Sequence, residues 1–175
     1  KQITQSGNNL NFKKIALFNF LVLAGVGLVL RYKIIAYLPW VDHKNLLHGH
    51  SHFAFCGWVS LYLMAAWAYL FRKDPNGHVH RQYAYLFVAY LIASYGMLFS
   101  FPFQGYGLIS ISFSVFSISI SYLFSFFAWQ DISTAEHIHK LSKICFRWAL
   151  VFFCVSSIGP FVLASAERIA AKHWQ

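Results

Sequence analysis

Long runs of apolar residues without charge constrain the fold of this chain more than any other feature. The run from Phe53 to Phe71 contains no charged side chain. It is long enough to cross a bilayer, which takes about 20 residues of helix. Across the chain, 58% of residues are hydrophobic and 11% are charged, whereas soluble domains have about 25% charged residues. We therefore predict an integral membrane protein of the all-α class, built as a polytopic bundle of transmembrane helices.

Five runs of this kind predict a single transmembrane domain over residues 1–175. The segment 101–107 contains proline and glycines and predicts a tight connection, so the third and fourth spans should form an antiparallel hairpin. No cleavage site for a signal peptide follows the first span. The first residue is not Met, which is consistent with residues missing at the start or with a chain that is one part of a longer protein or complex. The expected spans cover about residues 15–38, 51–71, 83–101, 107–129 and 146–166.

Positive charge is in excess, with a net charge of +9, but it is scattered over loops and membrane flanks. This distribution argues against a nucleic-acid partner and favours contact with a lipid bilayer. Lys and Arg residues are more numerous at the N-terminus and in the second and fourth loops than on the opposite side. Cytoplasmic loops carry such an excess. We therefore expect a cytoplasmic N-terminus, as in a protein of the bacterial inner membrane.

A cluster of histidines stands at the start of the second span. His48, His50 and His52 fall within five residues, and His43 lies just upstream. Imidazole binds metal ions and haem iron and carries protons, and it is costly at the edge of a membrane. On a helix, His48, His52 and Cys56 share one face, whereas His50 projects nearly opposite.

This pattern predicts a cofactor site. We expect His52, His50 and His48 to bind haem, or His48, His52, Cys56 and His43 to bind copper or another metal ion. The alternative is a set of polar residues that cap the helix and meet lipid headgroups. The last three spans contain no His, Asp, Glu, Lys or Arg in their interiors. A second ligand must therefore come from the cluster itself, from His173, or from another polypeptide.

A second group of histidines lies in two loops on the same side of the predicted topology. His78 and His80 occupy the second loop, and His137 and His139 occupy the fourth. Four imidazoles are able to surround zinc or copper. These loops offer neither Cys nor paired carboxylates, which favours solvated side chains.

Serines recur on one face of the fourth span, at spacings of three and four residues. The pattern indicates either a seam of small residues, against which another helix packs closely, or a hydroxyl-lined path for protons. Packing is favoured because the span has no acid, base or amide to anchor a relay. The residues concerned are Ser110, Ser114, Ser117, Ser121 and Ser125.

The segment from His50 to Trp58 reads His-x-His, four apolar or small residues, then Gly-Trp. It resembles a segment of membrane proteins related to the catalytic subunits of haem–copper oxidases, with nitric oxide reductases as the nearer branch. The resemblance implies that a histidine at the outer end of the second helix is an axial ligand of a low-spin haem. By position, His52 is the first candidate and His50 the second, and Gly57 would allow a helix or haem to approach closely.

Three functional hypotheses follow. The leading one is a protein that binds haem or copper at its outer face, for electron transfer, respiratory chemistry or gas-ligand sensing. The second is a proton-coupled transporter or channel that uses the histidines and the serine-lined helix. The third is a non-catalytic subunit that packs against other membrane subunits or against further copies of itself. Whether the chain is an enzyme stays open, because no Ser-His-Asp set, phosphate loop or carboxylate pair is present.

Overall fold

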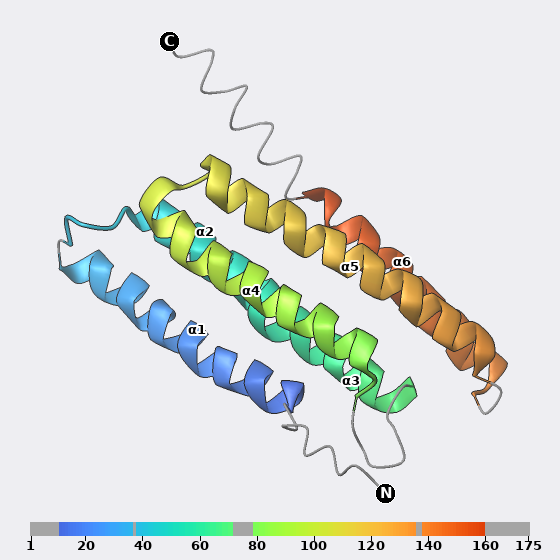
Figure 1. The fold of residues 1–175 in the computed structure, drawn as a ribbon. Helices are drawn as coiled ribbons and strands as arrows, with labels where there is room; N and C mark the ends of the chain where they lie inside the picture. The colour runs from blue at the N-terminus through green and yellow to red at the C-terminus, as the bar shows by residue number, and fades with distance from the viewer. Residues whose placement is uncertain (1–10, 37, 72–78, 136–137, 160–175) are drawn as a thin grey trace, which may run out of the picture.

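The computed structural model describes residues 11–36, 38–71, 79–135 and 138–159. Over these ranges the chain is an all-α bundle without a β-strand, which confirms the predicted class (Figure 1). The elements are α1 (Phe12–Ile35), α2 (His43–Phe53), the π-helix η1 (Ala54–Ser60), α3 (Leu61–Phe71), α4 (Arg81–Gln104), α5 (Leu108–Thr134) and α6 (Lys140–Ser156).

Four helical rods are long and apolar enough to cross a membrane, which supports the prediction of an integral membrane protein. They are α1, the continuous rod of α2, η1 and α3 over His43–Phe71, α4, and α5. The fifth predicted span, 146–166, lies partly outside the described residues. Its described part belongs to α6, which packs against α5.

Several helix boundaries differ from the expected spans by two to eight residues, and two of these differences bring polar residues into a helix. The second rod starts at His43 rather than near residue 51, because the side chain of Asp42 caps it by accepting a 2.9 Å hydrogen bond from the backbone N–H of Asn45. The helix α5 continues past residue 129 to Thr134 and so includes Asp131. In both places the helix extends beyond the apolar run that predicted it.

The rods alternate in direction, so the bundle has two ends (Figure 1). The histidine end is formed by the end of α1, the start of α2, the end of α4 and the start of α5. The opposite end carries the start of α1, the end of α3, the start of α4, the end of α5 and the start of α6. The helix α4 lies between the second rod and α5 and packs against both, and α1 flanks the second rod. As predicted, α4 and α5 form an antiparallel hairpin.

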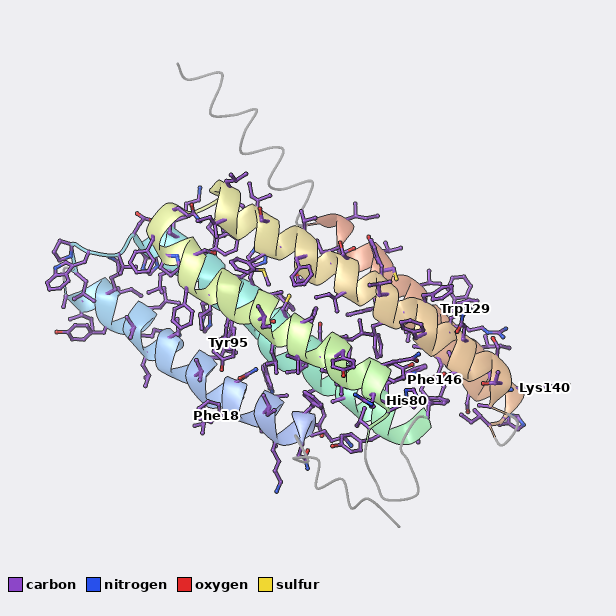
Figure 2. The ribbon with its side chains drawn as sticks, in the orientation of Figure 1. Phe18, His80, Tyr95, Trp129, Lys140 and Phe146 are labelled. Atoms are coloured by element: carbon purple, nitrogen blue, oxygen red, sulfur yellow. The ribbon has the colours of Figure 1, made fainter. Side chains whose placement is uncertain are left out.

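Buried side chains form one large cluster toward the opposite end and a small one nearer the histidine end. In the large cluster, the rings of Phe12 and Phe87 meet edge to face with centroids 5.0 Å apart, and Phe87 lies 6.3 Å from Phe124. Outward-facing positions are also apolar: Leu21 is 68% exposed and Phe18, which points away from the bundle in Figure 2, is 59% exposed. A surface of this kind suits lipid contact rather than water.

The π-helix η1 is tied to two neighbouring helices by a buried polar network. A π-helical turn replaces the regular α-helical pattern of backbone hydrogen bonds with a wider one. The side-chain amide of Asn19, on α1, donates a 2.6 Å hydrogen bond to the carbonyl oxygen of Gly57. The hydroxyl of Tyr95, on α4 (Figure 2), donates to Oδ1 of Asn19 at 2.8 Å. One fully buried amide thus joins α1, η1 and α4.

We expect Asn19→Ala to lower the free energy of unfolding by about 1–2 kcal/mol, because it leaves the Gly57 carbonyl and the Tyr95 hydroxyl without their partner. The measurement is unfolding in mixed detergent–SDS micelles followed by far-ultraviolet circular dichroism. Leu21→Ala on the same helix is the control, because its side chain faces outward. Equal unfolding midpoints for the two variants would contradict the proposed role of Asn19.

Candidate functional site

The histidine cluster lies inside α2, not at its edge. Because the helix starts at His43, the residues His48 to His52 occupy its second and third turns. His43 itself is exposed at the first position of the helix. Because all three clustered histidines lie within the regular part of α2, helical geometry sets the direction in which each side chain projects toward the neighbouring helices.

His48 and His52 face the end of α4 and the turn that follows it. The imidazole of His52 stacks on the ring of Phe101, with centroids 4.6 Å apart and an interplanar angle of 10°. The imidazole of His48 meets the ring of Tyr106 edge to face at 4.9 Å. Phe101 and Tyr106 are themselves in edge-to-face contact at 5.2 Å. The two imidazoles thus belong to one aromatic cluster, which we call the His48–His52 face.

His50 projects to the other side of α2, as the spacing predicted. A Cβ placed on Gly27 of α1 would lie 3.4 Å from Cε1 of His50. The absence of a side chain at Gly27 therefore leaves room for this imidazole between α1 and α2. The helix α2 presents imidazoles to two different neighbours.

Two glycines set the close packing around the His48–His52 face. A Cβ on Gly49 would lie 3.3 Å from Cβ of Phe101 and 3.4 Å from Cδ of Pro102, so α2 and α4 approach closely there. Gly105 ends α4 with φ of +57°, a conformation that side chains with a Cβ rarely adopt. This turn brings Tyr106 back over the histidines, and the hydroxyl of Ser110 donates to the Gly105 carbonyl at 2.5 Å.

Two imidazole nitrogens of the cluster are buried without a hydrogen-bond partner among the described residues. They are Nε2 of His48 and Nδ1 of His50. Buried polar atoms in proteins nearly always have a partner. An imidazole nitrogen without one is able to ligate a metal or to bond a group supplied from outside the chain. This is the chemical feature that separates the cluster from ordinary capping residues.

Cys56 lies on the same side of the second rod as His48 and His52, but it has different neighbours. Its buried thiol lies beside the hydroxyls of Tyr90 and Ser117. Tyr90 also accepts from the hydroxyl of Ser121 at 3.5 Å. Cys56 is thus part of a buried polar cluster between η1, α4 and α5.

A compact metal site is not assembled in the described part of the chain. Among those residues, no three His, Cys, Asp or Glu side chains gather in a group that could hold a metal ion. His78 and His137, two of the four loop histidines, lie outside the described residues, so that predicted set stays a prediction. Of the others, His80 precedes α4, and Nδ1 of His139 accepts from the N–H of Leu141 at 3.4 Å and caps α6.

The serine face of α5 packs against α4. The hydroxyl of Ser114 donates to Sδ of Met97 at 3.3 Å. Most of the hydroxyls also donate back to carbonyls of their own helix: Ser117 to Ser114 at 2.8 Å, and Ser121 to Ser117 at 3.0 Å. Serines arranged in this way act as small packing residues, which is the interpretation that the sequence favoured.

Several polar residues that matter in the structure were not singled out from the sequence. Asn19 is one, and its signal was a lone amide within an apolar run. The others are Tyr83 and Asp131, which are both buried, with the hydroxyl of Tyr83 donating to Oδ2 of Asp131 at 2.5 Å. Asp131 lay beyond the expected end of its span, which is why it was not treated as an interior acid.

No family model, curated protein or solved structure matches this chain. The resemblance of the segment from His50 to Trp58 to haem–copper oxidases therefore stays an expectation. The function has to be argued from the chemistry of the site.

We expect Gly105→Ala to destabilise the fold by at least about 1 kcal/mol, because a Cβ is disfavoured at positive φ. It would also lie 2.7 Å from Oδ1 of Asn45. Gly25→Ala is the matched control, since a Cβ at Gly25 meets nothing within 4 Å. Detergent–SDS unfolding of both variants provides the test. A Gly105→Ala variant as stable as Gly25→Ala would show that the turn does not require glycine.

Proposed function

We propose that this membrane protein binds haem at its histidine end and serves in electron transfer or gas-ligand binding. The observation that carries the proposal is the buried, unpartnered Nε2 of His48 within an aromatic cluster shared with His52. Haem iron takes one or two axial imidazoles, and its macrocycle prefers an apolar surround. Copper and zinc sites need more protein ligands in one place.

The ligand belongs to the His48–His52 face. His48 is favoured by its unpartnered nitrogen, and His52 is favoured by the resemblance of its segment to haem–copper oxidases. Phe101 and Tyr106 both contact the two imidazoles and give them a largely apolar environment. Bound haem would supply an iron that changes oxidation state or binds a small gas. Copper is the less favoured occupant, because no group of three metal-ligating side chains occurs among the described residues.

The second axial ligand would come from outside the described residues. On the described helices, the only other imidazole of the cluster buried without a partner is His50, and it faces α1. His173 of this chain and a histidine of another membrane subunit are the remaining sources. The proposal therefore includes a partner subunit, or a second copy, at the histidine end. A transporter that uses the serine face has less support, since those hydroxyls donate to their own helix.

We expect protein purified in mild detergent from haem-replete cells to show the visible absorption of haem. His48→Ala or His52→Ala should remove most of it, because the axial ligand is lost. His80→Ala at the opposite end is the control and should keep the spectrum. Haem content is measured as the pyridine complex, with metal analysis on the same sample and circular dichroism to verify folding.

A misfolded variant would also lose haem, so a rescue experiment is needed. Added imidazole should restore the spectrum of whichever alanine variant lacks the ligand, since it replaces the missing side chain. A colourless, metal-free wild-type preparation would reject the proposal. So would a double variant, His48→Ala with His52→Ala, that retains haem.

We place the histidine end on the outer side of a bacterial inner membrane, because Lys and Arg residues are more numerous on the opposite side. In a background with the three native cysteines replaced, Lys44→Cys should react with a membrane-impermeant maleimide in intact cells. Lys14→Cys, which is exposed at the opposite end, should react only after the membrane is opened. The reverse pattern would invert the topology.

A further inference from the structure

An apolar groove lies between α3, α5 and α6, away from the histidines. Its volume is about 340 Å³, within the range of roughly 300–1,000 Å³ that is usual for small-molecule sites. Its walls are almost entirely hydrocarbon and aromatic. They include Leu63, Met64, Trp67, Phe124, Phe146 and Leu150.

The groove has the length of one membrane leaflet. Along the second rod it runs from Ser60 to Leu70, a distance of about 15 Å at the rise of an α-helix. Half of the hydrocarbon core of a bilayer is also about 15 Å thick. The rod ends at Phe71, so the groove extends from the opposite end of the bundle toward the membrane centre. A single acyl chain of one leaflet matches this position.

Aromatic rings close the groove at the opposite end. The rings of Trp67 and Phe146 meet edge to face at 5.1 Å, and Trp67 stacks on Phe71 at 4.5 Å. Trp67 stands one helical turn from the end of α3, about 6 Å along the axis. Trp67 therefore lies in the outer third of the groove, close to the interface that tryptophan side chains favour. The indole N–H of Trp67 is buried without a partner among the described residues, and a lipid ester carbonyl beside it would supply an acceptor.

Basic side chains stand at the same end of the groove. On α6, Lys143 lies one turn before Phe146 and Arg147 directly follows it. The start of α6 at Lys140 is labelled with Phe146 and Trp129 in Figure 2. The guanidinium of Arg147 lies 5.2 Å from the ring centroid of Trp129, and its Nε is buried without a partner in the described part of the chain. No acidic side chain among the described residues pairs with either cation. A negative headgroup would complement this charge.

From these four features we propose that the groove holds one acyl chain of an anionic phospholipid. The chain packs along Leu63, Met64 and Leu150, the ester level lies beside Trp67, and the phosphate faces Lys143 and Arg147. The site is independent of the histidine end. It gives α6, which packs on α5, a further contact with the second rod through the bound lipid.

The test uses the full-length protein reconstituted in vesicles with equal amounts of phosphatidylglycerol and phosphatidylcholine of identical acyl chains. After gentle extraction in detergent, native mass spectrometry counts the lipids that remain on each protein. We expect each protein to retain one phosphatidylglycerol. Its affinity should exceed that of phosphatidylcholine about tenfold, because one charge-assisted hydrogen bond contributes a difference of that size. Ala149→Phe, which fills the wall of the groove, should abolish retention. Val155→Phe, at an exposed position on α6, should not.

A charge variant keeps the proposal testable if Ala149→Phe fails to fold. Lys143→Gln should remove most of the preference for phosphatidylglycerol, whereas Lys14→Gln, an exposed lysine at the same end on α1, should leave it unchanged. Equal retention of the two lipids, or retention that survives both Ala149→Phe and Lys143→Gln, would mean ordinary bulk-lipid contact and would overturn the proposal.

Discussion

The side-chain amide of Asn19 donates a hydrogen bond to the carbonyl of Gly57 in η1. This π-helix joins α2 to α3 within the longest helical rod, His43–Phe71. A polar side chain buried in hydrocarbon needs partners, and the Asn19 amide finds them in the Gly57 carbonyl of η1 and the Tyr95 hydroxyl of α4. Because a π-helical turn holds more residues than an α-helical turn, η1 rotates α2 relative to α3. This rotation lets α2 turn His48 and His52 toward α4 while α3 turns Met64 and Ala68 into the large core.

The histidine end follows from that arrangement. With α2 held close to α4 at Gly49, its imidazoles are divided between two environments. The His48–His52 face is surrounded by aromatic rings, whereas His50 lies beside a glycine of α1. One helix thus offers a potential ligand on each side without bringing three ligands together. Among the described residues, this division leaves no place where the several ligands of a zinc or copper ion gather.

The sequence was sufficient to predict the all-α class, the antiparallel hairpin and the opposite directions of His48 and His50. These features depend on hydrophobic length and helical spacing, which are local properties. It did not place the start of α2 at His43, because the Asp42 cap lies outside the apolar run that marked the span. It also did not predict η1, since residues 54–60 are as apolar as an ordinary helix. The contact between His52 and Phe101 joins distant segments, and spacing within one helix carries no information about it.

The serines of α5 have a consequence for how this helix behaves in lipid. By composition, α5 is one of the more polar spans. Its outward-facing serines nevertheless donate to backbone carbonyls of the preceding turn: Ser112 to Leu108 and Ser119 to Val115. Both hydroxyl protons are therefore hydrogen-bonded within α5 itself, without a partner from another helix. These two hydroxyls need no partner from lipid, and the contact of α5 with α4 is made mainly by close packing of small residues.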